Sequence, residues 1–156
     1  MKLTKAIFAA GCFWHVQFTF SSLKGVVKTT AGYCGGTVSN PTYEQVCTGK
    51  TGHAEAVLVE FDADVVSYSD LLEVFWEMHD PTQLNRQGPD VGSQYRSAIF
   101  YCTDEQKKMA QESLEREQKK LREKIVTEIV AFTEFYPAEE YHQDYFKKTR
   151  KRVCGI

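Results

Sequence analysis

Apolar residues along this chain follow two spacings, and their order predicts the secondary structure. Short runs of alternating or continuous apolar residues are typical of strands, whereas apolar residues three or four positions apart are typical of helices. The first pattern predicts strands at 5–10, 26–31, 54–61, 96–102 and 126–132. The second predicts helices at 12–23, 67–79, 103–124 and 138–148.

Polar residues support two of these helix starts, and two long stretches carry neither spacing. Ser67 or Ser69 is suited to cap one helix, and Thr103 with Gln106 matches a capping box. The stretches 33–52 and 80–95 are rich in Gly, Pro, Tyr and Asp and poor in charge. Loops of this length in a small domain are usually functional, so we expect both to contribute to a site.

The order of elements is β-α-β, loop, β-α, loop, β-α-β, which indicates an α+β fold. It contains the split β-α-β-β-α-β (ferredoxin-like) arrangement, with one more helix and strand appended. The chain has 156 residues, 42% of them apolar, which suits one folded domain over 1–156 and excludes wholesale disorder.

The net charge of −2, from 19 basic and 21 acidic residues, gives no sign of a nucleic-acid or anionic-membrane partner. No apolar run approaches the roughly 18 residues that span a bilayer, and the run 6–11 is too short for a secretory leader. We therefore expect a cytoplasmic protein, and a monomer.

The five cysteines, at 12, 34, 47, 102 and 154, are odd in number and lack a Cys-x-x-Cys pair, which argues against a disulfide framework or a zinc site. Cys12 follows a predicted buried strand and Gly11, and it begins a predicted helix. Unpaired N–H groups at a helix N-terminus favour a thiolate, so Cys12 is a candidate nucleophile. The alternative is a buried cysteine that packs as a small hydrophobic residue.

Glu55 is the second candidate, because strand periodicity places it on the face of Val57, Val59 and Phe61. A carboxyl group on an apolar face has a raised pKa and can act as a general acid beside Cys12, unless it lies at an exposed strand end. His53 is an alternative partner for Cys12, in a cysteine hydrolase.

Aromatic and acidic residues supply the rest of the candidate site. Phe13 and Trp14 adjoin Cys12 and can form an apolar wall for substrate, although they can equally be core residues. Hydroxyl donors and acidic groups of the two loops are Tyr33, Tyr43, Tyr95, Asp80 and Asp90. The basic tail 147–156 lowers the pKa expected for Cys154, which can reach a second sulfur.

Ordered motifs resemble those of the peptide methionine sulfoxide reductase A family over about residues 5–146. They are Gly11-Cys12-Phe13-Trp14, Gly32-Tyr33-Cys34-Gly35-Gly36, Asn40-Pro41-Thr42-Tyr43, Gly49–Val57, His79-Asp80-Pro81-Thr82, Arg86–Asp90, Gln94–Ala98 and Tyr141–Tyr145. The resemblance implies a two-layer α+β sandwich around a split β-α-β core. It also implies reduction of the S epimer of methionine sulfoxide, free or in oxidised proteins.

By the same resemblance, Cys12 attacks the sulfoxide sulfur and is left as a sulfenic acid. Glu55 protonates the sulfoxide oxygen with help from Tyr43 and Tyr95, and the remaining members of the site are Asp90, Phe13 and Trp14. Cys154 matches the resolving position, and thioredoxin or a similar dithiol reopens the disulfide. No metal or organic cofactor is implied.

Three departures from the family pattern are His15, Gln17 and the tail sequence before Cys154. The tail leaves Cys34 as an alternative resolving thiol. Two other functions stay open from the residues alone: a cysteine hydrolase that needs no reductant, and a redox sensor or binding module that does not turn over. Only the reductase requires both Cys12 and Glu55.

Overall fold

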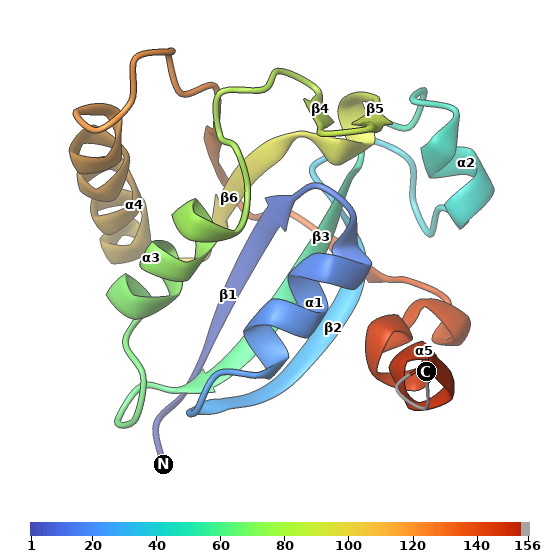
Figure 1. Ribbon diagram of the computed structural model, residues 1–156, viewed down its shortest axis with the longest axis horizontal. Coiled ribbons are helices and arrows are strands. Elements are labelled where there is room, and N and C mark those ends of the chain that lie inside the picture. The colour runs from blue at the N-terminus through green and yellow to red at the C-terminus, as the bar shows by residue number, and fades with distance from the viewer. Residues whose placement is uncertain (154–156) are drawn as a thin grey trace.

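The computed structural model describes residues 1–153, and their side chains as far as Thr149 (Figure 1). Its strands are β1 (Leu3–Ala10), β2 (Val26–Cys34), β3 (Ala54–Asp62), β4 (Arg86–Gln87), β5 (Asp90–Val91), β6 (Ser97–Tyr101), β7 (Glu128–Ala131) and β8 (Phe135–Pro137). Its helices are α1 (Phe13–Ser21), α2 (Tyr43–Cys47), α3 (Tyr68–Met78), α4 (Asp104–Gln118) and α5 (Tyr145–Val153). Single 3-10 turns lie at Ser93–Tyr95 and Glu140–His142.

One mixed sheet has the strand order β7-β6-β1-β3-β2-β8, and β4 and β5 form a separate hairpin. β1 is antiparallel to β3 and β6, β2 is antiparallel to β3 and β8, and only the β6–β7 pair is parallel. Ala10 lies opposite Ser97, and Tyr33 lies opposite Glu55. The C-terminal ends of β1 and β2 and the N-terminal ends of β3 and β6 therefore lie side by side at the same end of the sheet.

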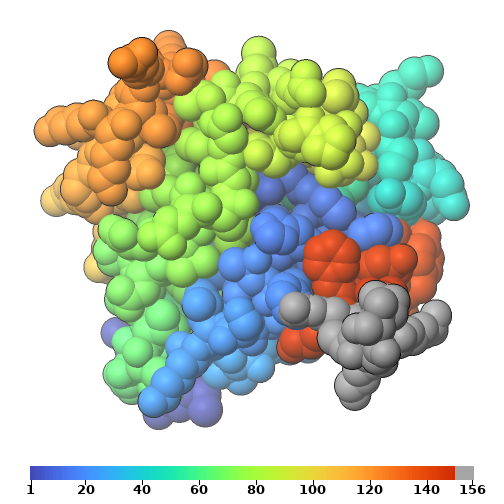
Figure 2. Space-filling view, in the orientation of Figure 1, coloured from blue at the N-terminus to red at the C-terminus, as the bar shows by residue number. Residues whose placement is uncertain are grey.

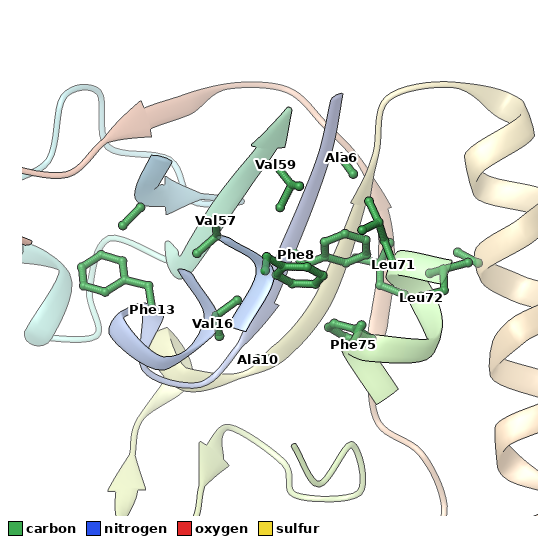
Figure 3. Packing of buried hydrophobic residues seen from close by; sticks show 14 of the residues in the cluster. Ala6, Phe8, Ala10, Phe13, Val16, Val57, Val59, Leu71, Leu72 and Phe75 are labelled. Atoms are coloured by element: carbon green, nitrogen blue, oxygen red, sulfur yellow. The ribbon is translucent and has the colours of Figure 1, made fainter. Parts of the chain in front are cut away.

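The main core lies between one face of the sheet and helices α1 and α3 (Figure 3). Phe8 of β1 is at its centre, with its ring centroid 5.0 Å from that of Phe20 on α1 and 5.4 Å from that of Phe75 on α3. Val57, Val59 and their alternate neighbours on β3 face the same core. The apolar spacing that predicts these helices and strands is thus explained by burial against one sheet face.

The other sheet face is also buried, under a smaller cluster of mostly small residues. Its members are Ile7, Ala9, Cys34, Ala54, Ala56, Ala98 and Phe100. Phe135 packs against this cluster, and the chain that leads from β7 to β8 passes behind the sheet in Figure 1. Burial on both faces explains why 54–61 is apolar or small at almost every position.

The predicted strands and the first three predicted helices are confirmed in type, but several boundaries are wrong. Ser67, and not Ser69, caps α3 in a complete capping box. Thr103 caps α4, but the side chain of Gln106 bonds to the Cys102 amide and the Lys5 carbonyl instead of closing the box. α4 ends at Gln118 instead of near residue 124.

The prediction of a helix over 138–148 is wrong in its first half. The Ala138 amide donates to the Ala31 carbonyl, which keeps the chain extended after β8. Asp144 then adopts a left-handed conformation, with φ 53°, and α5 begins only at Tyr145. Three short elements are missing from the prediction: α2, the β4–β5 hairpin and β8. Within residues 1–153, no helix is both long and apolar enough to span a membrane.

Candidate active site

Most of the candidate residues lie at the end of the sheet where β1 and β2 finish and β3 and β6 begin. Cys12 follows β1, Glu55 is the second residue of β3, and Tyr95 ends the turn before β6. Figure 2 shows the blue surface of α1 bordered by the yellow-green loop 80–95, by cyan α2 and by red α5. Both loops predicted to be functional, 33–52 and 80–95, therefore reach the start of α1.

The chain turns sharply from β1 into α1 at Gly11, and the structure explains why glycine is needed there. Gly11 has a φ of 95°, a conformation that other residues rarely adopt. A Cβ atom at this position would lie 2.9 Å from Cβ of Gln87, so the loop 80–95 approaches the backbone directly. The turn leaves Cys12 as the N-cap of α1 and only partly buried.

The sequence predicts that the helix N-terminus favours a Cys12 thiolate, and the structure corrects this. The amides of Trp14 and His15 do donate toward the sulfur and lower its pKa. Burial, together with the nearby Glu55 carboxylate, outweighs them and raises the pKa of Cys12 to about 11. At neutral pH the resting site therefore holds a Cys12 thiol.

Glu55 is buried as the strand periodicity predicts, with 1% of its surface exposed. Its Oε1 atom accepts a hydrogen bond from the Phe13 amide at 3.2 Å, which fixes the carboxyl group against the first turn of α1. Burial, with a smaller contribution from Asp90, raises the pKa of Glu55 to about 8. A carboxyl group that keeps its proton at neutral pH, beside a thiol, can protonate a poor leaving oxygen.

Tyr43 and Tyr95 lie in the electrostatic field of Glu55. Burial and this charge raise the pKa of Tyr95 to about 12, and Tyr43 shifts in the same direction. Both hydroxyls therefore remain hydrogen-bond donors at neutral pH. Asp90, half-buried at the start of β5, is close enough to raise the pKa of both Glu55 and Cys12.

Phe13 and Trp14 differ in how they are held. Phe13 is 1% exposed and belongs to the main core. Trp14 is half-buried, donates from Nε1 to Nδ1 of His142 at 3.0 Å, and stacks on Tyr145 of α5 with ring centroids 3.8 Å apart. One side of the indole is therefore already covered by the C-terminal helix.

The C-terminal segment contributes two further residues that the sequence reasoning missed, His142 and Glu139. His142 is 1% exposed, its ring lies 4.4 Å from that of Tyr43, and its Nε2 atom has no hydrogen-bond partner among the described residues. Because Nδ1 accepts from Trp14, Nε2 carries the proton and is a buried donor beside the candidate site. Glu139 binds Tyr33 and Tyr43. The motif Tyr141–Tyr145 was the available signal for this segment.

The alternative partners of Cys12 are not supported by the geometry. His53 is buried with both ring nitrogens occupied, Nδ1 by the Gly36 amide at 3.0 Å and Nε2 by the Val38 carbonyl at 2.7 Å. Cys34 lies in the cluster on the opposite sheet face, and burial raises its pKa to about 12. Neither is available to react with Cys12, which argues against the hydrolase and against Cys34 as resolving thiol.

The other cysteines and Asp80 have different surroundings. Cys102 follows the far end of β6, whereas Cys47 ends α2, exposed, one turn from Tyr43. Cys154 lies outside the described residues. Asp80 accepts from the Thr82 amide and hydroxyl, so it stabilises a turn. Among the described residues, no three His, Cys, Asp or Glu side chains are grouped to hold a metal ion.

Comparison with known proteins agrees with these features. The family model described as peptide methionine sulfoxide reductase matches residues 4–156. The peptide methionine sulfoxide reductase MsrA of Methanothermobacter thermautotrophicus is 60% identical over 99% of this chain and 93% of its own length. Reduced Mxr1 of Saccharomyces cerevisiae is 35% identical, with a TM-score of 0.91 over 96% of this chain and 87% of that chain.

A second solved state of Mxr1 is also similar, at a lower score. Mxr1 in complex with Trx2 is 26% identical, with a TM-score of 0.68 over 92% of this chain and 85% of that chain. The family match covers nearly the whole chain, including the turn that presents Cys12 and the strand that carries Glu55. The chain belongs to the peptide methionine sulfoxide reductase family.

Proposed function

We propose that Cys12 and Glu55 carry the thiol-dependent reduction of methionine sulfoxide that this family performs. The observation that supports these roles best is the buried Glu55 carboxyl group, bonded to the first turn of the helix that Cys12 caps. Cys12 attacks the sulfoxide sulfur, and the oxygen moves to the cysteine sulfur. The products are methionine and a Cys12 sulfenic acid, which balances one thiol and one sulfoxide.

Glu55 supplies the proton that the sulfoxide oxygen needs. Its pKa of about 8 keeps it protonated at neutral pH. When the proton moves to the oxygen, the Cys12 thiol returns a proton to the site, so Glu55 is restored at the end of the step. The hydroxyls of Tyr43 and Tyr95 and the carboxyl group of Asp90 complete the polar side of this pocket, and neutral hydroxyls stabilise the developing charge on the oxygen.

Phe13 and Trp14 form the apolar side, where the methyl group of the S epimer lies. The indole is fixed by His142 and Tyr145, so its free side is presented at a defined angle. A fixed apolar wall opposite fixed donors selects one arrangement of methyl group and oxygen around the sulfur. This selection supports the S epimer as substrate, free or in oxidised proteins.

Cys154 resolves the sulfenic acid in a disulfide with Cys12, and water leaves. Thioredoxin or a similar dithiol then reduces this disulfide, as the complex of the related Mxr1 with Trx2 suggests. The reduction potential of thioredoxin, about −270 mV, is low enough for it to reduce this disulfide.

We also assign residues 1–156 to a single catalytic domain with a basic C-terminal tail, 147–156, because both sheet faces pack into continuous clusters and α1 contacts α5 (Tyr145–Val153). The antiparallel order β6-β1-β3-β2, with α1 and α3 on one face, supports a split β-α-β (ferredoxin-like) core in a two-layer sandwich.

A single turnover tests the proposal. Pre-reduced protein is mixed with each epimer of a methionine sulfoxide substrate, and released methionine and remaining thiols are counted. We expect about one methionine per protein from the S epimer and the loss of two thiols. Cys154→Ser should still release methionine but lose one thiol, whereas the matched Cys34→Ser should behave as wild type. No methionine from either epimer would refute the proposed function.

A further inference from the structure

A single carboxylate outside the proposed chemistry joins two walls of the site. Glu139 follows β8, and its two oxygens have different partners. Oε1 accepts from the Tyr33 hydroxyl at 2.8 Å, and Oε2 accepts from the backbone amide of Tyr43 at 3.0 Å. The three residues belong to β2, to α2 and to the segment after β8, which are 10 to 106 positions apart in sequence.

The first partner, Tyr33, is the cross-strand neighbour of the candidate acid. Tyr33 is fully buried and pairs with Glu55 across the β2–β3 ladder, so the two side chains share one sheet face. Its ring centroid lies 5.8 Å from that of Phe13. A buried hydroxyl needs an acceptor, and Glu139 provides it. The Tyr33 hydroxyl is therefore bonded to Glu139 and not to the neighbouring Glu55 carboxyl group.

The second partner is the first residue of α2, a helix of only five residues. So short a helix is unstable by itself, because nucleation fixes several residues for few hydrogen bonds. α2 depends instead on the contacts at its N-terminus. Thr42 and Gln45 form a capping box, and Glu139 accepts a hydrogen bond from the backbone amide of Tyr43. A carboxylate at a helix N-terminus is also favoured by the helix dipole.

Glu139 also belongs to the segment that holds Trp14. His142, three residues later, accepts from the Trp14 indole, and its ring lies 4.4 Å from that of Tyr43. A shift of Glu139 would thus move the start of α2 relative to both the indole and Glu55. Its neighbour Glu140 differs, since it is exposed and its carboxylate lies 3.8 Å from Nζ of Lys148 on α5.

We propose that Glu139 is a positioning residue for the reaction, which holds Tyr43 at the distance from Glu55 that the sulfoxide oxygen requires. Glu139 does not touch the substrate and acts through the start of α2. This inference rests on the proposed function, because it assumes that the Tyr43 hydroxyl stabilises the transition state.

The rate of methionine release in a single turnover at saturating S-sulfoxide tests this role in five variants. Loss of one hydrogen bond to a developing charge lowers a rate by about ten- to a hundred-fold. Glu139→Ala and Tyr43→Phe should each show a loss of this size, with little change in the substrate concentration for half-maximal rate. Glu139→Gln should lie between wild type and Glu139→Ala, because its one oxygen can still accept from the Tyr43 amide.

Two comparisons separate positioning from a general effect on folding or charge. Glu140→Ala removes the same charge one residue away and should keep the wild-type rate. The double variant, Glu139→Ala with Tyr43→Phe, should release methionine less than about twofold more slowly than Tyr43→Phe alone, because both substitutions remove the same interaction. A full multiplicative loss in the double variant, or equal losses in the Glu139→Ala and Glu140→Ala variants, would overturn the inference.

The same measurements keep this inference distinct from the proposed function. A wild-type protein that releases no methionine refutes the reductase roles themselves. A wild-type protein that turns over, with Glu139→Ala as fast as wild type, refutes only the positioning role. Thermal unfolding of each variant shows whether a lost rate accompanies a lost fold, and a Glu139→Ala protein that unfolds at room temperature would also refute the specific role in the reaction.

Discussion

Glu55→Gln is expected to stabilise the fold, and to do so more strongly as the pH rises. Glu55 is buried, and its pKa is raised from 4.5 to about 8. Because the folded state binds the proton more tightly than the unfolded chain, the contribution of Glu55 to stability is full below the unfolded pKa and is lost as pH rises through the folded pKa. Glutamine keeps the acceptor for the Phe13 amide but has no charge to desolvate.

The size of the effect follows from the two pKa values. Each tenfold change in the ratio of proton affinities is worth about 1.4 kcal/mol. Relative to strongly acid conditions, titration of Glu55 should lower the free energy of unfolding of wild type by about 2 kcal/mol at about pH 6 and by about 5 kcal/mol at about pH 9. Glu55→Gln lacks this loss, so its advantage over wild type should grow by about 3 kcal/mol between these two pH values.

Urea unfolding of both proteins at the two pH values measures this difference, because all other titrating groups are shared. A matched Glu140→Gln variant, in which an exposed carboxylate is neutralised, should show no growing advantage. A Glu55→Gln advantage that is constant with pH would show that Glu55 is not held protonated by burial. The general-acid argument would then lose its physical basis.

Three further results are expected. The single-turnover rate of wild type should fall as pH rises through about 8, where Glu55 loses its proton, and a rate that rises steadily to about pH 10 would contradict this. Gly11→Ala should destabilise the fold by about 1–3 kcal/mol in urea unfolding, because φ is positive and Gln87 is in contact, whereas Gly49→Ala, with open space around it, should cost less. Burial lowers the pKa of His79 to about 4, so wild type should lose about 3 kcal/mol more than His79→Gln between about pH 7 and pH 4, since the unfolded chain takes the proton first as pH falls; equal losses would refute this.

The sequence predicts the fold best where burial of one face of an element gives its apolar residues a regular spacing. Successive side chains of β3 point to opposite sheet faces, and Val57 and Val59 face the main core. The same period of two correctly places Glu55 on the face of these two residues, where it is buried. The turn at Gly11 is similarly local, since a positive φ is a property of one residue. Both features leave a local mark in the sequence, a residue spacing or a single glycine, which a sequence pattern can carry.

Other features depend on partners far away in sequence, and the pattern could not show them. α2 has only five residues, and its first amide binds Glu139, 96 positions later. The sequence shows the helix N-terminus, which lowers the pKa of Cys12, but it does not show the burial and the approach of Glu55 that raise this pKa. β8 is three residues long and is defined by its ladder to β2, so no periodicity can identify it.

The bond between the Trp14 indole and His142 joins positions 128 residues apart, and this has a consequence for how reactivity arises. During synthesis Cys12 emerges early, but part of its surroundings comes much later in the chain, with the segment around Glu139 and His142. A partly synthesised chain therefore carries an ordinary, solvated thiol. The contacts that hold Trp14 and Tyr43 form only once this distant segment has docked, so docking of the segment, and not emergence of Cys12, completes the candidate site.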